Sequence, residues 1–216
     1  MNELLSADQP NGKQRRIGVL YSGSSHQHRT FTEPKYAKWI TKLYYLPETE
    51  SGEISTAECD VLIIPSQLHR TQTLRLQPDI RRFVKDGGIV AALGAQPDHL
   101  LDDHHWEFRP TNFWWWLEPG ADSGLVAVSP DHDFFRFLTL SDATWHYHGV
   151  FHPADDAEVL IATKDGGVIL YLSRSENGGC RIMTTLDPEF HYGSYFMPAT
   201  ERFLDGFFPW LAAGHF

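Results

Sequence analysis

The sequence predicts an α/β protein with a mainly parallel central sheet and an antiparallel elaboration in its C-terminal half. Two continuous apolar runs, residues 60–65 and 89–93, are typical of parallel strands that are covered on both faces. Between them, apolar residues recur at helical spacing and the pattern ends at Gly87 and Gly88. A strand, a helix and a second strand in this order predict a right-handed βαβ unit.

The remaining elements follow from similar patterns. Residues 16–21 predict a first buried strand that ends in the small polar loop 22–25. Pro34 is suited to the first turn of a helix, on which Ala37, Ile40 and Tyr44 would form an apolar stripe. We expect a flexible N-terminus over 1–15 and a single domain over 16–216.

The second half of the chain changes character. Four apolar segments without long helices between them predict strands at 145–151, 158–163, 168–173 and 181–186. Residues 164–167 have the composition of a hairpin turn between two of these strands. A final helix over 199–211 would place Phe203, Leu204, Phe207 and Leu211 on one side.

Composition excludes several classes of function. The chain has 216 residues, 18 of them basic and 28 acidic, and a net charge of −10. This balance argues against nucleic acid and against an anionic membrane surface as partners, since both need basic patches. The two cysteines form no disulfide framework, and no apolar segment is long enough to cross a membrane, so we expect a cytoplasmic location.

Three segments in order resemble landmarks of the class I glutamine amidotransferase-like superfamily, including its trehalose-utilisation-like branch. Residues 60–67 resemble the strand and oxyanion loop of that superfamily, residues 87–96 the strand that leads into its nucleophile elbow, and residues 184–189 its closing strand. The resemblance spans about residues 16 to 211. It implies a flavodoxin-like three-layer sandwich, in agreement with the fold class above.

The resemblance also implies that the glutaminase triad is degenerate. Active members carry Gly-x-Cys-x-Gly, a polar residue and Gln, and matching the end of that pattern to Gln96 puts Ala92 where the cysteine belongs. A shift of one or two residues would put Leu93 or Gly94 there, and none of the three offers a nucleophile. In the closing motif Asp187 replaces the histidine while Glu189 remains, so we expect no glutaminase activity.

A pocket is nevertheless expected at the carboxyl ends of the parallel strands, where open α/β sheets bind ligands. We predict that it binds a small polar molecule, with a carbohydrate as one candidate. Polar and histidine-bearing loops follow each strand, and the expected ligand contacts are Ser22, Gln67, Gln96, His146, His148, Glu189 and His191.

His146 and His148 are the candidates for a metal site. On a strand they would project to the same face, about 7 Å apart at Cα, which suits two ligands of one divalent metal, with His191, His152 or Glu189 as the third. The alternative is a histidine pair that is hydrogen-bonded in a polar crevice. We expect no cofactor otherwise.

Two alternatives to simple ligand binding remain open. One is a metal-dependent or acid–base enzyme that uses His146, His148, Glu189 and His191, with Glu189 and His191 as its catalytic candidates. The other is a structural protein in which residues 112–117, with three consecutive tryptophans, form a homodimer interface. Those aromatic side chains would serve a saccharide platform as well as they would serve a core or an interface.

Overall fold

The structure is a computed structural model that describes residues 14–96, 100–101, 105–110, 113–195 and 197–216. Most of the N-terminus that was expected to be flexible therefore lies outside the described residues. Arg15 is fixed by a hydrogen bond from its backbone N–H to the carbonyl of Ala212, 3.0 Å long. No helix in the described ranges is both long and apolar enough to cross a membrane.

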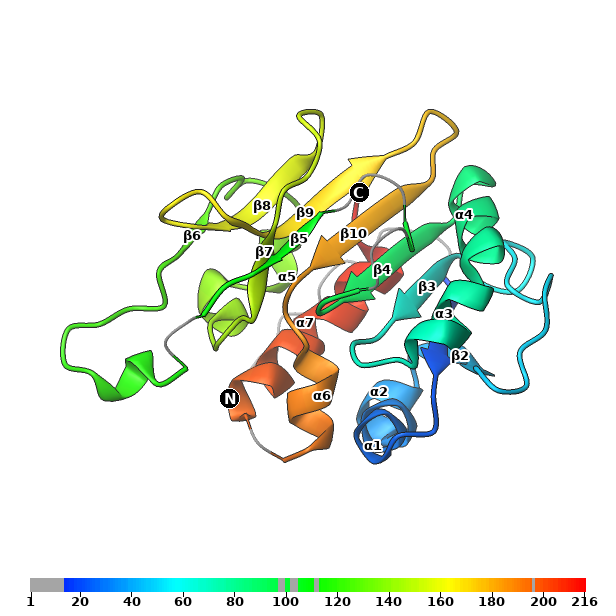
Figure 1. Cartoon of the computed structure of the whole chain (residues 1–216), viewed down its shortest axis with the longest axis horizontal. Helices are drawn as coiled ribbons and strands as arrows, with labels where there is room; N and C mark the ends of the chain where they lie inside the picture. The colour runs from blue at the N-terminus through cyan, green and yellow to red at the C-terminus, as the bar shows by residue number, and fades with distance from the viewer. Residues whose placement is uncertain (1–13, 97–99, 102–104, 111–112, 196) are drawn as a thin grey trace, which may run out of the picture.

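The centre of the molecule is one ten-stranded sheet (Figure 1). One half is parallel and has the order β2-β1-β3-β4-β10. Its strands are β1 Ile17–Tyr21, β2 Ile40–Tyr45, β3 Val61–Ile64, β4 Ile89–Leu93 and β10 Cys180–Thr184. The other half is antiparallel, with β5 Trp106–Phe108, β6 Leu125–Ala127, β7 Gly149–Phe151, β8 Glu158–Thr163 and β9 Val168–Arg174.

Helices cover the sheet on both faces, which completes the predicted α/β sandwich. The long helix α7 lies behind the sheet in Figure 1, whereas α3 and α4 lie in front of it. The α-helices are α1 Ser25–Thr32, α2 Pro34–Ala37, α3 Arg70–Arg75, α4 Gln77–Lys85, α5 Phe134–Phe137, α6 Pro188–Gly193 and α7 Pro198–Ala213. Two 3₁₀ turns, η1 Trp115–Leu117 and η2 Leu140–Ala143, lie in the connection between β5 and β7.

The continuous apolar runs of the parallel strands supply two separate cores. Successive side chains of a strand point to opposite faces. Ile63 accordingly packs in the core that contains Phe203 of α7, while Ile64 packs in the core that contains Ile80 of α4. All four residues are buried. Burial on both faces explains why these strands do not alternate in polarity.

Most predicted elements are confirmed. β1, β3, β4, β8, β9 and β10 lie within one or two residues of the predicted strands, β8 and β9 form a hairpin at 164–167, and α7 contains the predicted final helix. The expected helix through Ile40 and Tyr44 is wrong. The helix ends at Ala37, and Ile40–Tyr45 forms the edge strand β2, parallel to β1. Along this strand the side chains alternate in exposure, as a half-covered edge strand requires.

The fold depends on close contact between α1 and α6. A Cβ atom added at Gly193 in α6 would lie 2.1 Å from the carbonyl oxygen of His26 in α1. Alanine would otherwise favour the helix by about 1 kcal/mol. We expect Gly193→Ala to lower the free energy of unfolding by about 2 kcal/mol or more, measured by urea denaturation, because two backbones must separate.

Gly166→Ala in the β8–β9 turn is the matched control. Gly166 has φ +94° and nothing within 4 Å of an added Cβ, so only backbone strain of about 1–2 kcal/mol is expected there. Equal stability of Gly193→Ala and the wild type would show that α1 and α6 do not pack this closely.

Candidate functional site

Three strand-end loops meet at Gly94, directly after β4. The Gly94 N–H donates a 2.9 Å hydrogen bond to the carbonyl of Leu186, just after β10. An added Cβ at Gly94 would lie 2.6 Å from Cβ of Ser66 and 3.6 Å from Cβ of Asp187, and φ here is +69°. Only glycine fits such a position without strain. The carboxyl ends of β3, β4 and β10 are therefore brought into one place.

Glu189 lies beneath this junction and holds it together. Its side chain is fully buried, and its Oε1 accepts a 2.6 Å hydrogen bond from the backbone N–H of Ser66. Its backbone carbonyl accepts a 2.8 Å hydrogen bond from Thr30 Oγ1 in α1. Burial raises the pKa of Glu189 to about 7, hydrogen bonding from Ser66 opposes the rise, and the Asp187 carboxylate adds to it.

His146, His148 and His191 converge beside Glu189. The centroid of the His146 ring lies 4.5 Å from that of His191 and 5.1 Å from that of His148. One ring nitrogen from each histidine can be chosen so that all three lie within 4.8 Å of one another. The expected strand over 145–151 is wrong, because only Gly149–Phe151 is a strand. His146 and His148 instead share a site through the irregular segment that precedes β7.

Asp187 lies against two of these histidines. Its Oδ1 is 3.2 Å from Nε2 of His191, and its Oδ2 is 3.8 Å from Nε2 of His148. Both Asp187 and His191 are almost completely buried, whereas the side chain of His148 is 43% exposed. Burial, aided by the neighbouring His191, lowers the pKa of His146 to about 4. His146 is consequently a neutral imidazole at pH 7.

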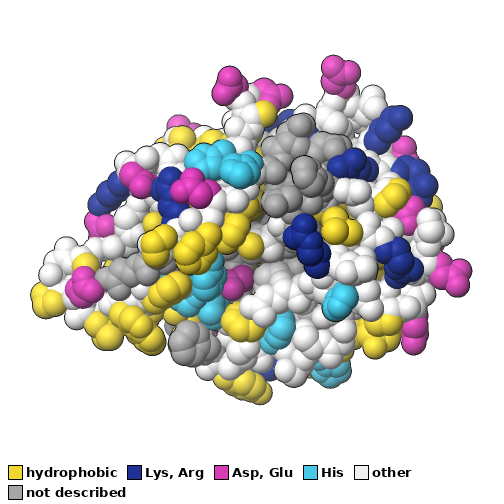
Figure 2. Space-filling model, in the orientation of Figure 1, with side chains coloured by type: hydrophobic (Ala, Val, Ile, Leu, Met, Phe, Trp, Pro, Cys, Tyr) yellow, Lys and Arg dark blue, Asp and Glu magenta, His cyan; other side chains and the backbone are white. Residues whose placement is uncertain are grey.

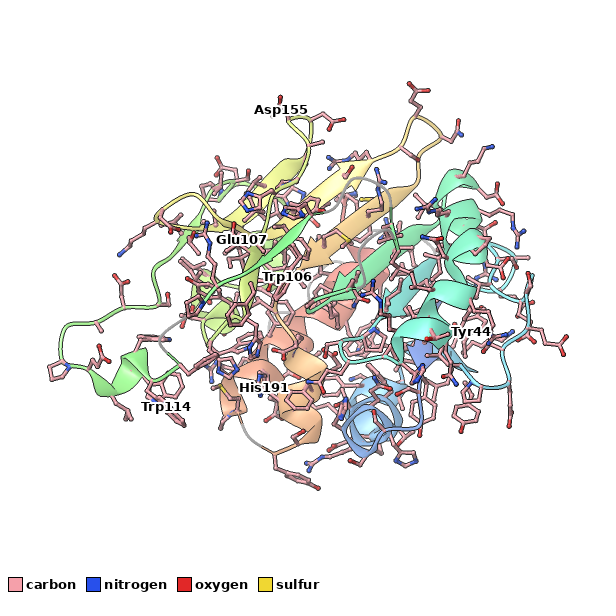
Figure 3. The ribbon with its side chains drawn as sticks, viewed as in Figure 1. Tyr44, Trp106, Glu107, Trp114, Asp155 and His191 are labelled. Carbon is pink, nitrogen blue, oxygen red and sulfur yellow. The ribbon has the colours of Figure 1, made fainter. Side chains whose placement is uncertain are left out.

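A cavity of about 470 Å³ opens onto this cluster. Its wall is mainly aromatic and imidazole, and none of the described residues that line it is Asp, Glu, Lys or Arg. Histidine side chains lie beside a band of hydrophobic side chains on this face (Figure 2), and His191 and Trp114 occupy the same edge of the molecule (Figure 3). The lining residues are Gln67, Phe113, Trp114, Trp116, His146, His148, Phe190, His191, Ser194 and Met197.

The tryptophan segment forms the outer wall of the cavity. Trp114 is 53% exposed and Trp116 is 42% exposed, and their ring centroids are 5.4 Å apart. Trp115 lines a second, smaller cavity of about 290 Å³, which also contacts His146. Asn112, the first residue of the segment, lies outside the described residues. Four side chains of the segment line a cavity and belong to neither hydrophobic core, namely Phe113, Trp114, Trp115 and Trp116.

The structure brings some of the predicted ligand contacts together and separates others. Gln67, His146, His148 and His191 line the cavity, and Gln67 has the strained backbone angle φ 56° often found at binding sites. The remaining three do not line it. Glu189 is buried behind the cavity wall, the Ser22 N–H and hydroxyl both donate to Gln27 Oε1, and Gln96 Nε2 donates to the carbonyl of Leu93.

No thiol reaches the strand-end edge. Ala92 is buried inside β4 in the core that contains α4, and Gly94 is the residue at the strand end. Both cysteines of the sequence are free and buried. Cys59 precedes β3 and Cys180 begins β10, so each lies at the amino end of its parallel strand, away from Gly94.

Phe190, Ser194 and Met197 are cavity residues that the sequence interpretation missed. The polar loop expected after the last strand is instead helix α6, which begins at Pro188. The signal was present, since proline is common in the first helical turn. A helix from Pro188 would have placed Phe190 and Ser194 on one face, next to His191.

Solved structures of low sequence identity share this architecture. A glutamine amidotransferase from Thermotoga maritima superposes with a TM-score of 0.51 at 12% identity, over 89% of this chain and 81% of its own. The chain has the glutamine amidotransferase-like fold. The mmIFT52 N-terminal domain superposes equally well on this chain, with a TM-score of 0.51 at 11% identity, over 90% of this chain and 96% of its own.

These likenesses establish the fold alone, because two differently described proteins match equally well and one scaffold hosts unrelated functions. No protein-family model matches the sequence, and no curated protein matches it. The chemistry of this chain has to be inferred from its own side chains.

The pKa of Glu189 predicts a pH-dependent stability. Folded Glu189 keeps its proton up to about pH 7, whereas in the unfolded chain it loses the proton near 4.5. The folded state therefore binds more protons in this window, and Glu189 makes the protein less stable as the pH rises through it. Glu189→Gln keeps the acceptor for Ser66 but cannot titrate. We expect its free energy of unfolding to rise by about 3 kcal/mol relative to that of the wild type as the pH increases from 4.5 to 7.5, measured by urea denaturation.

His146 acts in the opposite direction and supplies the control. Its folded pKa of about 4 lies below the ordinary value of 6.5, so its contribution to stability rises with pH across that window. The wild-type profile should thus be nearly flat, whereas His146→Gln should leave the downward trend of Glu189 visible. A Glu189→Gln profile parallel to wild type would show that the carboxyl titrates normally.

Proposed function

We propose that this chain is an amidotransferase-like protein without glutaminase activity, which binds a small, neutral, polar molecule in the 470 Å³ cavity at the strand ends. The observation that carries the proposal is the composition of the cavity wall. Among the described residues, this wall offers aromatic faces and imidazoles but no Asp, Glu, Lys or Arg. Such a wall favours an uncharged ligand, since a charged group would lose its hydration without gaining a partner of opposite charge.

A saccharide is the ligand class that we favour. Trp114 and Trp116 offer exposed aromatic surface, which is costly to leave in water and common where ligands bind. The imidazoles and the amide of Gln67, which also line the cavity, supply donors and acceptors for the hydroxyl groups of a sugar. A cytoplasmic location remains part of the proposal, in keeping with two free, buried cysteines.

Acid–base catalysis on the bound molecule is a second candidate. It is favoured by the 3.2 Å contact between Asp187 and His191, because a carboxylate on one ring nitrogen can orient an imidazole as a general base. Glu189 is less suited to touching a substrate, since it is fully buried and does not line the cavity. Turnover of a bound sugar that is lost in His191→Gln while binding is kept would select this candidate.

Glutamine should not be a substrate. We expect purified protein to release glutamate and ammonia from glutamine no faster than buffer does, because Ala92, Leu93 and Gly94 offer no group for a covalent acyl intermediate. Coupled glutamate detection measures this, and Cys59→Ala and Cys180→Ala are the controls. Glutamate release that exceeds the buffer rate and disappears in either cysteine variant would overturn the proposal.

Trp114→Ala should weaken saccharide binding about tenfold or more and change the melting temperature little, because an exposed side chain contributes little to stability. Tryptophan fluorescence and thermal-shift titration against mono- and disaccharides measure both effects. Phe108→Ala is the matched control, since Phe108 is 63% exposed but does not line the cavity.

Three outcomes would count against the saccharide assignment. One is that no sugar or polyol changes the fluorescence or the melting temperature of the wild type. Another is that Phe108→Ala weakens binding as much as Trp114→Ala does. The third is that Trp114→Ala turns a dimer into monomers in light scattering, which would favour the homodimer alternative for the tryptophan segment.

A further inference from the structure

The three histidines that line the cavity pack edge to face against one another. The ring planes of His146 and His148 meet at 80°, and those of His146 and His191 meet at 89°. Edge-on packing brings ring nitrogens of all three to within 4.8 Å of one another. Imidazoles gain little from one another in this arrangement, and if they were protonated they would repel.

His146 provides an independent observation. It is only 6% exposed, and no described residue forms a hydrogen bond with its Nδ1, which is itself buried. Buried polar nitrogens are rarely left without a partner. A cation among the three rings would supply that partner and would also remove the repulsion between them.

We propose that His146, His148 and His191 bind one divalent transition-metal ion, with zinc as the reference ion. Three neutral imidazoles are the ligand set of many zinc sites and suit zinc, cobalt, nickel and copper better than calcium or magnesium. Nitrogens at about 2.1 Å from a tetrahedral ion are about 3.4 Å apart, so the rings must approach one another by up to about 1.4 Å on binding.

His148 can make most of that movement. Its side chain is 43% exposed and it lies in the irregular segment before β7, not within a strand. His146 and His191 are nearly buried and provide the rigid part of the site. A small side-chain rotation of His148 toward them closes the ligand set.

Asp187 completes the site as a positioning residue. Its carboxylate contacts Nε2 of His191 at 3.2 Å and faces Nε2 of His148 at 3.8 Å. Metal-bound histidines commonly pair their other ring nitrogen with a carboxylate, which orients the ring and increases its basicity. One buried carboxylate that faces two of the three histidines fits this role.

The cavity leaves the metal accessible on one side. All three histidines line the 470 Å³ cavity, so a ligand oxygen or water can occupy the fourth position. Three protein ligands and one open position distinguish catalytic and ligand-binding zinc sites from closed structural sites. The metal site does not depend on the saccharide proposal, although a sugar hydroxyl in the cavity could reach the open position.

Metal titration tests the site directly. Protein freed of metal with a chelator should bind one equivalent of Zn²⁺ in competition with a chromophoric chelator. Co²⁺ should give the visible absorption of a four-coordinate site. His148→Ala should weaken Zn²⁺ binding at least 100-fold while the melting temperature of the metal-free protein stays unchanged. Asp187→Asn should weaken binding about 10- to 100-fold and alter the Co²⁺ spectrum.

His152→Ala is the matched control. His152 is a half-exposed histidine whose Nε2 pairs with Glu107 at 2.6 Å, outside the cavity. Its loss should leave Zn²⁺ affinity unchanged. His146→Gln and His191→Gln repeat the test at the buried positions, with circular dichroism of the metal-free variants to establish folding.

The proposal is overturned if wild-type protein binds less than half an equivalent of Zn²⁺, or if His148→Ala binds as tightly as wild type. Equal losses in His148→Ala and His152→Ala would also overturn it. Because the titration contains no sugar, failure of the metal site and failure of saccharide binding are observed separately.

Discussion

The hydrogen bond from the Ser66 N–H to Glu189 is the contact on which the site depends. It joins the first residues of α6 to the loop after β3, and Thr30 joins α1 to the same residue through the Glu189 carbonyl. A fully buried carboxyl is unfavourable unless its oxygens are hydrogen-bonded or it keeps its proton. The pKa of Glu189, raised to about 7, shows that the hydrogen bond from Ser66 offsets only part of the effect of burial. The buried residue Glu189 therefore joins three elements that are distant in sequence, namely α1, the loop after β3 and α6.

That fixed junction determines what can surround it. With Glu189 holding α6 in place, Asp187 and His191 face the segment that carries His146 and His148. Burial favours the neutral form of His146 as well as of Glu189, while the buried carboxylate of Asp187 faces His148 and His191. Imidazoles beside a buried carboxylate and behind an aromatic wall suit a polar ligand or a metal ion.

The sequence predicted the parallel half of the fold well and the site only in part. Strands buried on both faces, such as β3 and β4, are encoded in local apolar runs, which is why they could be recognised. Edge strand β2 has no such run, and its spacing also matched a helix. The meeting of His146 with His191 depends on packing between residues 45 apart in sequence, which local pattern does not encode. Ser22 and Gln96 were expected in the pocket because they follow strands, yet their side chains satisfy internal hydrogen bonds.

The fold alone does not determine the function, because many of the side chains that line the cavity come from outside the parallel half of the sheet. The positions around Gly94 and Glu189, at the ends of the parallel strands, contribute a tight turn and a buried anchor. His146 and His148 come instead from the irregular segment before β7, and Trp114 and Trp116 come from the connection between β5 and β6. The cavity therefore lies where the parallel core meets the elaboration. The core supplies Asp187 and His191 on a rigid frame, and the elaboration supplies the residues that choose the ligand. Functional divergence on this scaffold is consequently expected to follow changes in the elaboration more closely than changes in the core.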